Sequence, residues 1–257
     1  MSIHPTAIID PAAKSPSSCK IGPYCVIGPN VELGEECELI SHVTIQGPAK
    51  IGARNKFFPF SSIGLAPQDL SYSGQPTRLE IGDDNVIREF VSIHTGTMQD
   101  RGVTRVGNAN LLLAYVHIAH DCVVGSNTTF SNNAQLAGHV VIDDWVVMGG
   151  FSGVHQFCRV GTHAMVAAGA VVLQDVPPYV TASGYPATPH GTNNEGLRRR
   201  GFTTEQITAV RRAYRTLYRE GHPLEESRAR IAAQAATDDV VAPLAAFLEH
   251  TGRGIVR

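Results

Sequence analysis

The sequence predicts a mainly β protein, with a parallel β-helix over residues 1–178 followed by a small α-helical domain over residues 193–257. The first observation is a six-residue period: from Ile3 to Val172 every sixth residue is large and apolar, with a single exception and two insertions. This period fits neither an amphipathic helix nor an alternating strand. It is typical of a β-helix, whose coils must stack to bury their apolar faces. The second observation is that the pattern becomes helical after Pro177-Pro178.

Composition excludes several classes of protein. The chain has 257 residues, of which 43% are apolar and 17% charged, with a net charge of -2. Such a balance gives no general attraction to nucleic acid or to an anionic membrane. The chain contains no run of 18 apolar residues and no visible secretory signal. We therefore expect a cytoplasmic protein with no nucleic-acid partner and no stable membrane insertion.

The five cysteines follow the period, because each lies four residues after an anchor: Cys19, Cys25, Cys37, Cys122 and Cys158. Elsewhere this position is usually occupied by Ala, Val or Thr, and a free cysteine behaves as a small hydrophobic residue. No Cys-X-X-Cys pair occurs, and disulfides are rare in the cytoplasm. We expect these cysteines to fill the core.

Two insertions interrupt the repeats, near residues 65–78 and 98–104. Insertions in a solenoid form loops on one face, which is often the binding face. Asp69 and Tyr72 in the first loop favour such a role over surface loops without function.

Beyond the prism, residues 179–192 are rich in Gly, Pro and Thr and are expected to form a connector. Thr203 or Thr204 can cap a helix that ends near Gly221 and has one apolar face: Ile207, Val210, Tyr214, Leu217 and Tyr218. Pro223 suits the first turn of another helix.

Several histidines fall into register. Three six-residue units make one coil, so residues equally placed in successive coils stack about 4.8 Å apart. With the second insertion looped out, the residues that follow anchors Ile93, Ile118, Leu136 and Val154 rise along one corner: His94, His120, Gly138 with His139, and His155 with Gln156. None takes an inward anchor position, so we expect these side chains to face solvent or a neighbouring subunit. Polar residues are common outside solenoids, but four rungs in register favour a functional site.

The chemistry of this corner centres on His120, which directly precedes Asp121. A carboxylate beside an imidazole orients it as a general base. Neighbouring residues of a strand face opposite ways, so contact between the two requires a bend. The backbone N–H of Gly138, one rung further, could stabilise an oxyanion. With no obvious Ser or Cys nucleophile beside His120, the pattern indicates direct attack of a substrate hydroxyl or amine on an acyl carbon.

The chain resembles the UDP-N-acetylglucosamine O-acyltransferase family over essentially its whole length. The most specific segments are His117-Ile-Ala-His-Asp-Cys122, Leu136-Ala-Gly-His139, Val154-His-Gln-Phe157, Gln174-Asp-Val-Pro-Pro-Tyr179 and Asn194-Glu-Gly-Leu-Arg-Arg-Arg-Gly-Phe202. The resemblance implies a left-handed β-helix, an acyltransferase of the first committed step of lipid A biosynthesis, and a homotrimer with active sites between subunits.

The resemblance also implies roles for matching residues. His120 would take the proton of the sugar 3-hydroxyl as it attacks a 3-hydroxyacyl thioester on acyl carrier protein, Asp121 would support this base, and the Gly138 amide would bind the oxyanion. Asp69, His94, His117, His139 and Gln156 would line the acceptor and acyl site, and Asn193, Glu195, Arg199 and Arg200 would hold the nucleotide and its phosphates. No metal or resident cofactor is expected, because the phosphopantetheine of acyl carrier protein carries the acyl donor. That acidic partner would dock on Arg198, Arg211, Arg212 and Arg215.

Two departures from the family pattern carry information. Ser71 stands where the family often has Lys, which removes a cation near the acceptor; acceptor affinity is then weaker or another residue substitutes. Ala168, near Met165, stands where some members have Gly at the base of the acyl groove. The extra methyl group predicts a shorter acyl chain than the Gly members use, with discrimination of about 1–3 kcal/mol per methylene.

Other functions remain alternatives. Carbonic anhydrases of the γ type also place histidines on such prisms and bind zinc, with His117 and His120 as candidate ligands here, but they lack the helical tail and its triple Arg. An N-acyltransferase of the same pathway has a separate N-terminal domain, whereas the repeats here begin at Ile3. A non-catalytic solenoid would not need the polar ladder. A 3-amino sugar nucleotide as acceptor also remains open.

Overall fold

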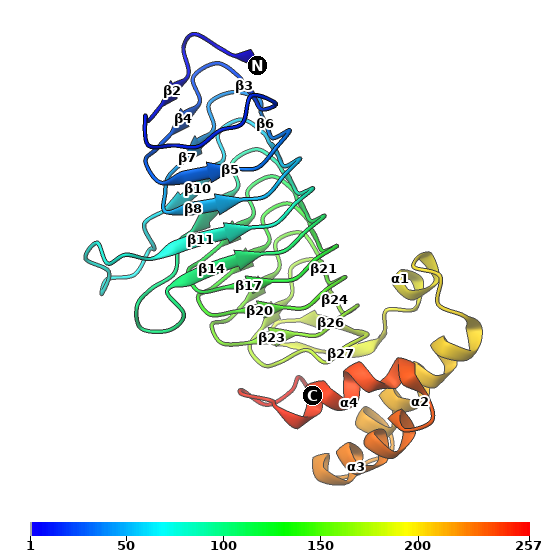
Figure 1. Cartoon of the computed structure of the whole chain (residues 1–257). Helices are drawn as coiled ribbons and strands as arrows, with labels where there is room; N and C mark the ends of the chain where they lie inside the picture. Colours follow the sequence, from blue (N-terminus) through cyan, green and yellow to red (C-terminus); the bar gives the residue numbers. More distant parts are fainter. Residues whose placement is uncertain (1) are drawn as a thin grey trace.

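The structure, a computed structural model, describes residues 2–257. The chain forms a left-handed parallel β-helix of stacked three-sided coils, with a helical domain at the end opposite the N-terminus (Figure 1). The fold class agrees with the prediction from the repeats, and the hand agrees with what the family resemblance implies.

Three sheets form the sides of the prism. The eleven-stranded sheet contains β1 (Ser2–Ile3), β3 (Lys20–Ile21), β6 (Glu38–Leu39), β9 (Lys56–Phe57), β12 (Val86–Ile87), β15 (Leu111–Leu112), β18 (Thr129–Phe130), β21 (Val147–Met148), β24 (Met165–Val166), β26 (Val180–Gly184) and β27 (Ala187–Thr192). The nine-stranded sheet contains β2 (Ile8–Ile9), β4 (Val26–Ile27), β7 (Thr44–Ile45), β10 (Ser62–Leu65), β13 (Ser92–His94), β16 (His117–Ile118), β19 (Gln135–Leu136), β22 (Gly153–Val154) and β25 (Val171–Val172). The seven-stranded sheet contains β5 (Val31–Leu33), β8 (Ala49–Ile51), β11 (Arg78–Ile81), β14 (Val103–Val106), β17 (Val123–Val124), β20 (Val141–Ile142) and β23 (Arg159–Val160).

The anchors stack on one another as the period predicts. Ile118 pairs with Ile93 on one side and with Leu136 on the other, and Leu136 pairs in turn with Val154. These side chains lie in one continuous buried core, together with all five cysteines, which are free and buried. The prediction that the cysteines fill the core is confirmed.

At most corners of the prism the chain makes a tight turn in which one residue has a positive φ. This conformation is uncommon for residues other than glycine, yet it recurs in columns along the prism. The corner between the nine- and seven-stranded sheets carries Asp121, His139 and Phe157, and the corner between the seven- and eleven-stranded sheets carries Trp145 and His163. The corners therefore direct polar and aromatic side chains outward in register.

Both insertions leave the prism as loops. The first runs over residues 66–77, between β10 and β11, as predicted. The second runs over residues 95–102 and thus begins and ends earlier than the predicted 98–104. The reason is that Val103 and Thr104 pair with Arg78 and Leu79, which lengthens β14 at its start.

The C-terminal part differs from the sequence prediction at residues 179–192. This stretch forms β26, which pairs in parallel with β24, and β27, which pairs with β26 in antiparallel fashion. The expected connector is thus a hairpin that closes the prism, because Val180 and Ala182 face the core and are buried.

The helical domain contains α1 (Asn194–Arg199), α2 (Thr204–Tyr218), α3 (Leu224–Ala235), η1 (Asp239–Val241) and α4 (Ala242–Glu249). Thr203 caps α2 through a capping box with Gln206. The predicted apolar face of this helix is buried against its own domain and the end of the prism. In residues 2–257, the structure has no helix long and apolar enough to cross a membrane.

Candidate active site

A hollow of about 470 Å³ opens on the outer face of the nine-stranded sheet, beside its corner with the seven-stranded sheet. The stacking of β16, β19 and β22 places His120, Gly138 and His155 along one side of it. Its remaining wall is mostly apolar: Ala119, Leu136, Ala137, Val154, Val171 and Leu173. The hollow thus combines an apolar surface with a line of polar groups.

His120 and Asp121 form a direct pair, with His120 Nδ1 at 3.0 Å from Asp121 Oδ2. The bend that this contact requires is the corner itself, where Asp121 has a φ of 57°. Asp121 has no exposed surface. Its carboxylate also accepts hydrogen bonds from the backbone N–H and the hydroxyl of Thr97, at 2.9 and 2.6 Å. The Asp121 N–H donates to the Thr104 hydroxyl at 2.8 Å, so the acid is held from two sides.

Gly138 lies against the ring of His120. A Cβ on this residue would come within 2.5 Å of His120 Cε1, so any side chain here would displace the imidazole. Within residues 2–257 the Gly138 N–H has no hydrogen-bond acceptor, whereas its carbonyl accepts from the Phe157 N–H. A backbone donor is therefore available beside His120.

His139 sits next to His120, with ring centroids 4.9 Å apart in an edge-to-face arrangement. Its other neighbours are Phe157, on which it stacks at 4.4 Å, and Asp100, whose Oδ2 lies 2.8 Å from His139 Nδ1. Both insertions contribute to this corner, because Asp100 belongs to the second and Asp69 to the first.

A metal ion could find ligands at this corner. Ligand atoms of His120, Asp121 and His139 all lie within 4.8 Å of one another, and nitrogen and carboxylate donors suit zinc. His117, the other ligand suggested by sequence spacing, is not part of this group; its Nδ1 lies 2.7 Å from Ser92 Oγ. The Asp121 oxygens already accept several hydrogen bonds, which favours a role in orienting His120.

His94 was expected to face solvent or a neighbouring subunit, and this prediction is wrong. The residue is only 6% exposed; its ring lies 5.0 Å from that of His117, and the N–H of the following Thr95 donates to the Leu65 carbonyl. Burial, together with the nearby charges of His117 and His120, lowers the pKa of His94 to about 4. His94 is therefore neutral at physiological pH. Its Nδ1 is buried without a hydrogen-bond partner in the described part of the chain.

Asp69 belongs to the same region. Its Oδ1 accepts hydrogen bonds from the hydroxyl and the backbone N–H of Ser71, at 2.7 and 2.8 Å. These bonds lower the pKa of Asp69, and the nearby imidazoles of His120 and His139 add to this direction when they carry a proton. Gln99 of the second insertion donates in turn to the Ser71 hydroxyl. Ser71 thus links the two loops at the position where the family often has Lys.

The residues expected to hold a nucleotide lie at another corner. Arg200 Nη1 is 3.0 Å from His163 Nδ1, and its guanidinium lies over the Trp145 ring at 5.3 Å. Burial and the Arg200 charge lower the pKa of His163 to about 4. A neutral His163 can therefore accept a hydrogen bond from Arg200.

Beside this group, Asn193 caps α1 by accepting from the Gly196 N–H and also donates to the His163 carbonyl. Glu195 and Arg199 form an exposed ion pair at 3.0 Å on the same helix. All four residues expected at the nucleotide therefore occupy α1 and its ends.

One chain does not bring all candidate residues together. His120 lies at the corner between the nine- and seven-stranded sheets, whereas Ala168 and Met165 lie on and after β24, near the corner between the eleven- and nine-stranded sheets. In Figure 1, α1 and the first insertion project from opposite sides of the prism.

Sequence reasoning missed several residues of these groups. Thr97, Gln99 and Asp100 lie in the second insertion, where no period indicates position. Trp145 and His163 could have been found, because each lies three residues after an anchor and they are one coil apart.

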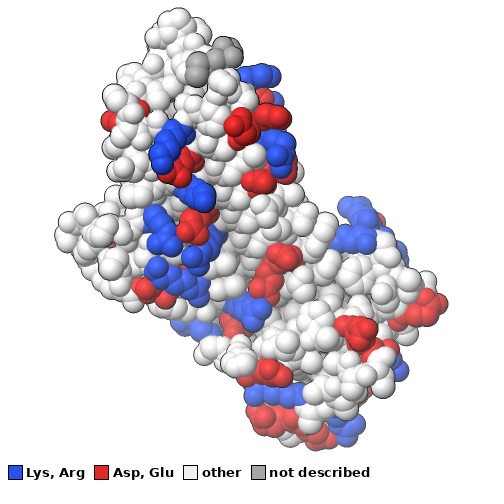
Figure 2. Space-filling view, in the orientation of Figure 1, with Lys and Arg blue, Asp and Glu red and all other residues white. Residues whose placement is uncertain are grey.

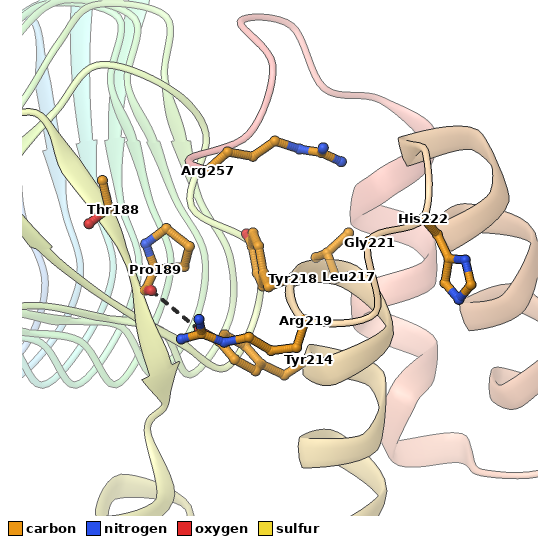
Figure 3. Close-up of a pocket in the computed structure, with 9 residues that line it drawn as sticks. All are labelled: Thr188, Pro189, Tyr214, Leu217, Tyr218, Arg219, Gly221, His222 and Arg257. Atoms are coloured by element: carbon orange, nitrogen blue, oxygen red, sulfur yellow. Dashed lines mark hydrogen bonds between the residues drawn. The ribbon is translucent and has the colours of Figure 1, made fainter.

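A second hollow lies at the junction of β27 and α2 (Figure 3). Its walls include Tyr214, whose hydroxyl donates to the Pro189 carbonyl at 3.3 Å, and the cations Arg219 and Arg257. None of the candidate site residues lines it.

The chain was compared with known proteins. The family model for domain 2 of UDP N-acetylglucosamine O-acyltransferase matches residues 175–256. An acyl-[acyl-carrier-protein]--UDP-N-acetylglucosamine O-acyltransferase of Thiobacillus denitrificans is 56% identical over 255 residues, covering 99% of both chains. The solved UDP-N-acetylglucosamine O-acyltransferase of Moraxella catarrhalis superposes with a TM-score of 0.98 at 47% identity, covering 100% of both chains. That of Francisella novicida gives 0.97 at 46% identity, covering 99% of this chain and 94% of the other.

The burial of His94 predicts a loss of stability in acid. Its pKa of about 4 in the folded chain lies below the ordinary 6.5, so the unfolded chain binds more protons as pH falls between these values. The free energy of unfolding should therefore decrease from pH 7 to pH 5, by about 2 kcal/mol from this residue. Thermal or urea unfolding of His94→Gln should show a shallower decrease than the parent, and exposed His190→Gln should match the parent. Identical pH dependence in His94→Gln would contradict the assignment.

Proposed function

The chain belongs to the UDP-N-acetylglucosamine O-acyltransferase family, and from this premise we propose how its residues perform the reaction. It is an acyltransferase that moves an acyl chain from acyl carrier protein to UDP-N-acetylglucosamine, the first step of lipid A biosynthesis. The proposed acceptor atom is the sugar 3-hydroxyl oxygen, and the proposed donor is a 3-hydroxyacyl thioester. The observation that carries the mechanism is the His120–Asp121 pair beside the free N–H of Gly138.

His120 acts as the general base. With Nδ1 held by Asp121, its Nε2 takes the proton of the sugar hydroxyl as the oxygen attacks the thioester carbon. The resulting oxyanion accepts a hydrogen bond from the Gly138 N–H. When this intermediate collapses, the carbon–sulfur bond breaks, and protonated His120 returns the proton to the departing phosphopantetheine thiolate. The sugar ester and the free thiol are the products.

A covalent enzyme intermediate is not part of this route. Cys122, two residues after His120 in the sequence, is fully buried, and burial raises the pKa of its thiol to about 12. A buried thiol that stays protonated is a poor nucleophile. We also infer that the reaction needs no resident cofactor or metal, because the phosphopantetheine of acyl carrier protein brings the activated acyl group.

A homotrimer with shared active sites is the proposed assembly. The outward residues of the nine-stranded sheet, beside the hollow, carry no Lys, Arg, Asp or Glu: Ile8, Val26, Thr44, Ser62, Ser92, His117, Gln135, Gly153 and Val171. The seven-stranded sheet instead carries ion pairs such as Lys14–Glu32 and Arg105–Glu80, which appear as mixed charges in Figure 2. An uncharged face suits contact with another copy. A neighbouring copy would also supply the nucleotide group that one chain holds away from His120.

The nucleotide and acyl carrier protein are assigned to the α1 side. Arginine forks suit phosphate, and Figure 2 shows basic side chains gathered over α1, where Arg198 and Arg199 lie. Arg212 pairs with Asp238, and Arg198 lies 3.5 Å from Glu195. Arg211 and Arg215 have no carboxylate partner within residues 2–257, which makes them the more available docking contacts among the four predicted. A cytoplasmic location is proposed on the strength of the free, buried cysteines.

His120→Ala should lower turnover of UDP-N-acetylglucosamine with a 3-hydroxyacyl carrier protein by about 10²–10⁴-fold, because the base is lost. Exposed His4→Ala serves as the control and should retain parental turnover. Near-normal turnover in His120→Ala would overturn the mechanism. Elemental analysis of the active parent tests the metal alternative: one zinc per subunit would favour the carbonic anhydrase-like reading.

The shared site predicts complementation between two inactive variants. His120→Ala and Arg200→Ala should each have low activity alone, because one lacks the base and the other a nucleotide contact. In mixed trimers, some sites combine an intact His120 from one chain with an intact Arg200 from the next. Random 1:1 mixing should restore about one quarter of the sites. Activity that stays at the level of the separate variants would place both residues in the same chain's site.

Ala168→Gly should shift the preferred donor towards a longer 3-hydroxyacyl chain, because removal of the methyl group extends the acyl groove. A change of about 1–3 kcal/mol per methylene sets the scale. Competition between acyl carrier proteins bearing graded chains measures the preference, and Ala109→Gly, the same change at another exposed corner, should leave it unchanged. Equal or better use of the longest acyl chain by the parent would contradict the assignment of Ala168 as a limit on chain length.

A further inference from the structure

The second insertion, residues 95–102, contacts two groups of the candidate site directly and a third through Ser71. Thr97 donates to Asp121, as described above. Gln99 donates to Ser71, which donates to Asp69. Asp100 contacts His139. The first two contacts join the loop to groups that already have assigned roles, whereas the third has no role in the mechanism so far.

The Asp100–His139 contact is well defined. Asp100 Oδ2 lies 2.8 Å from His139 Nδ1, and the His139 side chain is 11% exposed. Stacking on Phe157 and the edge contact with His120 fix the plane of the ring. A carboxylate at Nδ1 makes that nitrogen the proton donor and leaves Nε2 as the acceptor of a neutral imidazole. Asp100 is the nearer of two carboxylates at this nitrogen, since Asp121 Oδ2 lies 4.0 Å from it, and only Asp100 is within hydrogen-bond distance. It thus favours the tautomer in which Nε2 can receive a hydrogen bond from a ligand.

Closure of the loop does not depend on this contact. The Gly102 N–H donates to the Thr97 carbonyl at 2.9 Å, and the Arg78 N–H donates to the Gly102 carbonyl at 3.0 Å. Asp100 itself is 35% exposed, and pairs of this kind contribute little to stability, about 0–1 kcal/mol. Loss of the contact should therefore change the state of the His139 ring rather than the stability of the fold.

We propose that Asp100 is a positioning residue, which holds His139 with Nδ1 protonated so that Nε2 accepts a hydrogen bond from a hydroxyl of the sugar-nucleotide acceptor. This inference rests on the proposed function. It assigns the second insertion a part in acceptor recognition, in addition to its support of Asp121.

Kinetics of Asp100→Ala provide the first test. Loss of the carboxylate frees the tautomer of His139, so KM for UDP-N-acetylglucosamine should rise by about tenfold to a hundredfold, with a smaller change in kcat and in KM for the acyl carrier protein. Asp100→Asn should show a similar rise, because an amide can also donate to Nδ1. Met98→Ala, at an exposed position of the same loop, is the control and should match the parent.

A double variant separates positioning from structural support. If Asp100 acts through His139, adding Asp100→Ala to His139→Ala should raise the acceptor KM no further. The inference would be overturned if the two substitutions raised the acceptor KM additively. It would also be overturned if Asp100→Ala left the acceptor KM unchanged while the parent is active.

Nuclear magnetic resonance of nitrogen-labelled histidine supplies a readout that does not need turnover. The parent should show the Nδ1–H tautomer of His139, assigned by comparison with His139→Ala, and Asp100→Ala should lose this preference. An inactive parent would contradict the proposed function, but the nitrogen shifts would still test the role of Asp100. The same His139 tautomer in the parent and in Asp100→Ala would overturn the inference that Asp100 positions His139.

Discussion

Stacking of six-residue units is the constraint on which the rest of the molecule depends. Because a regular coil returns after 18 residues, as from Val123 to Val141, the place of a side chain on the prism follows from its distance to an anchor. Corner residues with positive φ then turn whole columns of side chains outward. Groups far apart in the sequence meet by register rather than by the packing of separate elements.

The register explains how much of the candidate site could be predicted from the sequence. The pairing of Ile118 with Leu136 follows from the period alone, so His120 and Gly138 could be placed on adjacent rungs. The contact between His120 and Asp121 could be foreseen only as a need for a bend, which the corner supplies. The hand of the helix could not be predicted in this way, because a six-residue period is the same for either hand.

Residues outside the six-residue period could not be placed from the sequence. Thr97 and Asp100 lie in a loop whose path depends on its contacts with the finished prism, and no spacing rule places them. His94 lies where the chain leaves β13 for this loop, and its burial could not be predicted from the period either. The hairpin of β26 and β27 was not predicted, because its Gly, Pro and Thr content is typical of loops. Val180 and Ala182 nevertheless alternate with polar neighbours, as expected of a strand.

The burial of Asp121 decides what the second insertion does. A carboxylate without exposed surface is costly unless hydrogen bonds compensate for the lost water. Thr97 provides these bonds from the insertion; without them the carboxylate would keep His120 at 3.0 Å and, farther away, His139 at 4.0 Å. The insertion is therefore part of the corner that holds the proposed base, His120, through Asp121. Through Gln99 and Ser71 the second insertion also contacts Asp69. The same loop therefore holds both Asp121, beside the proposed base, and the first insertion.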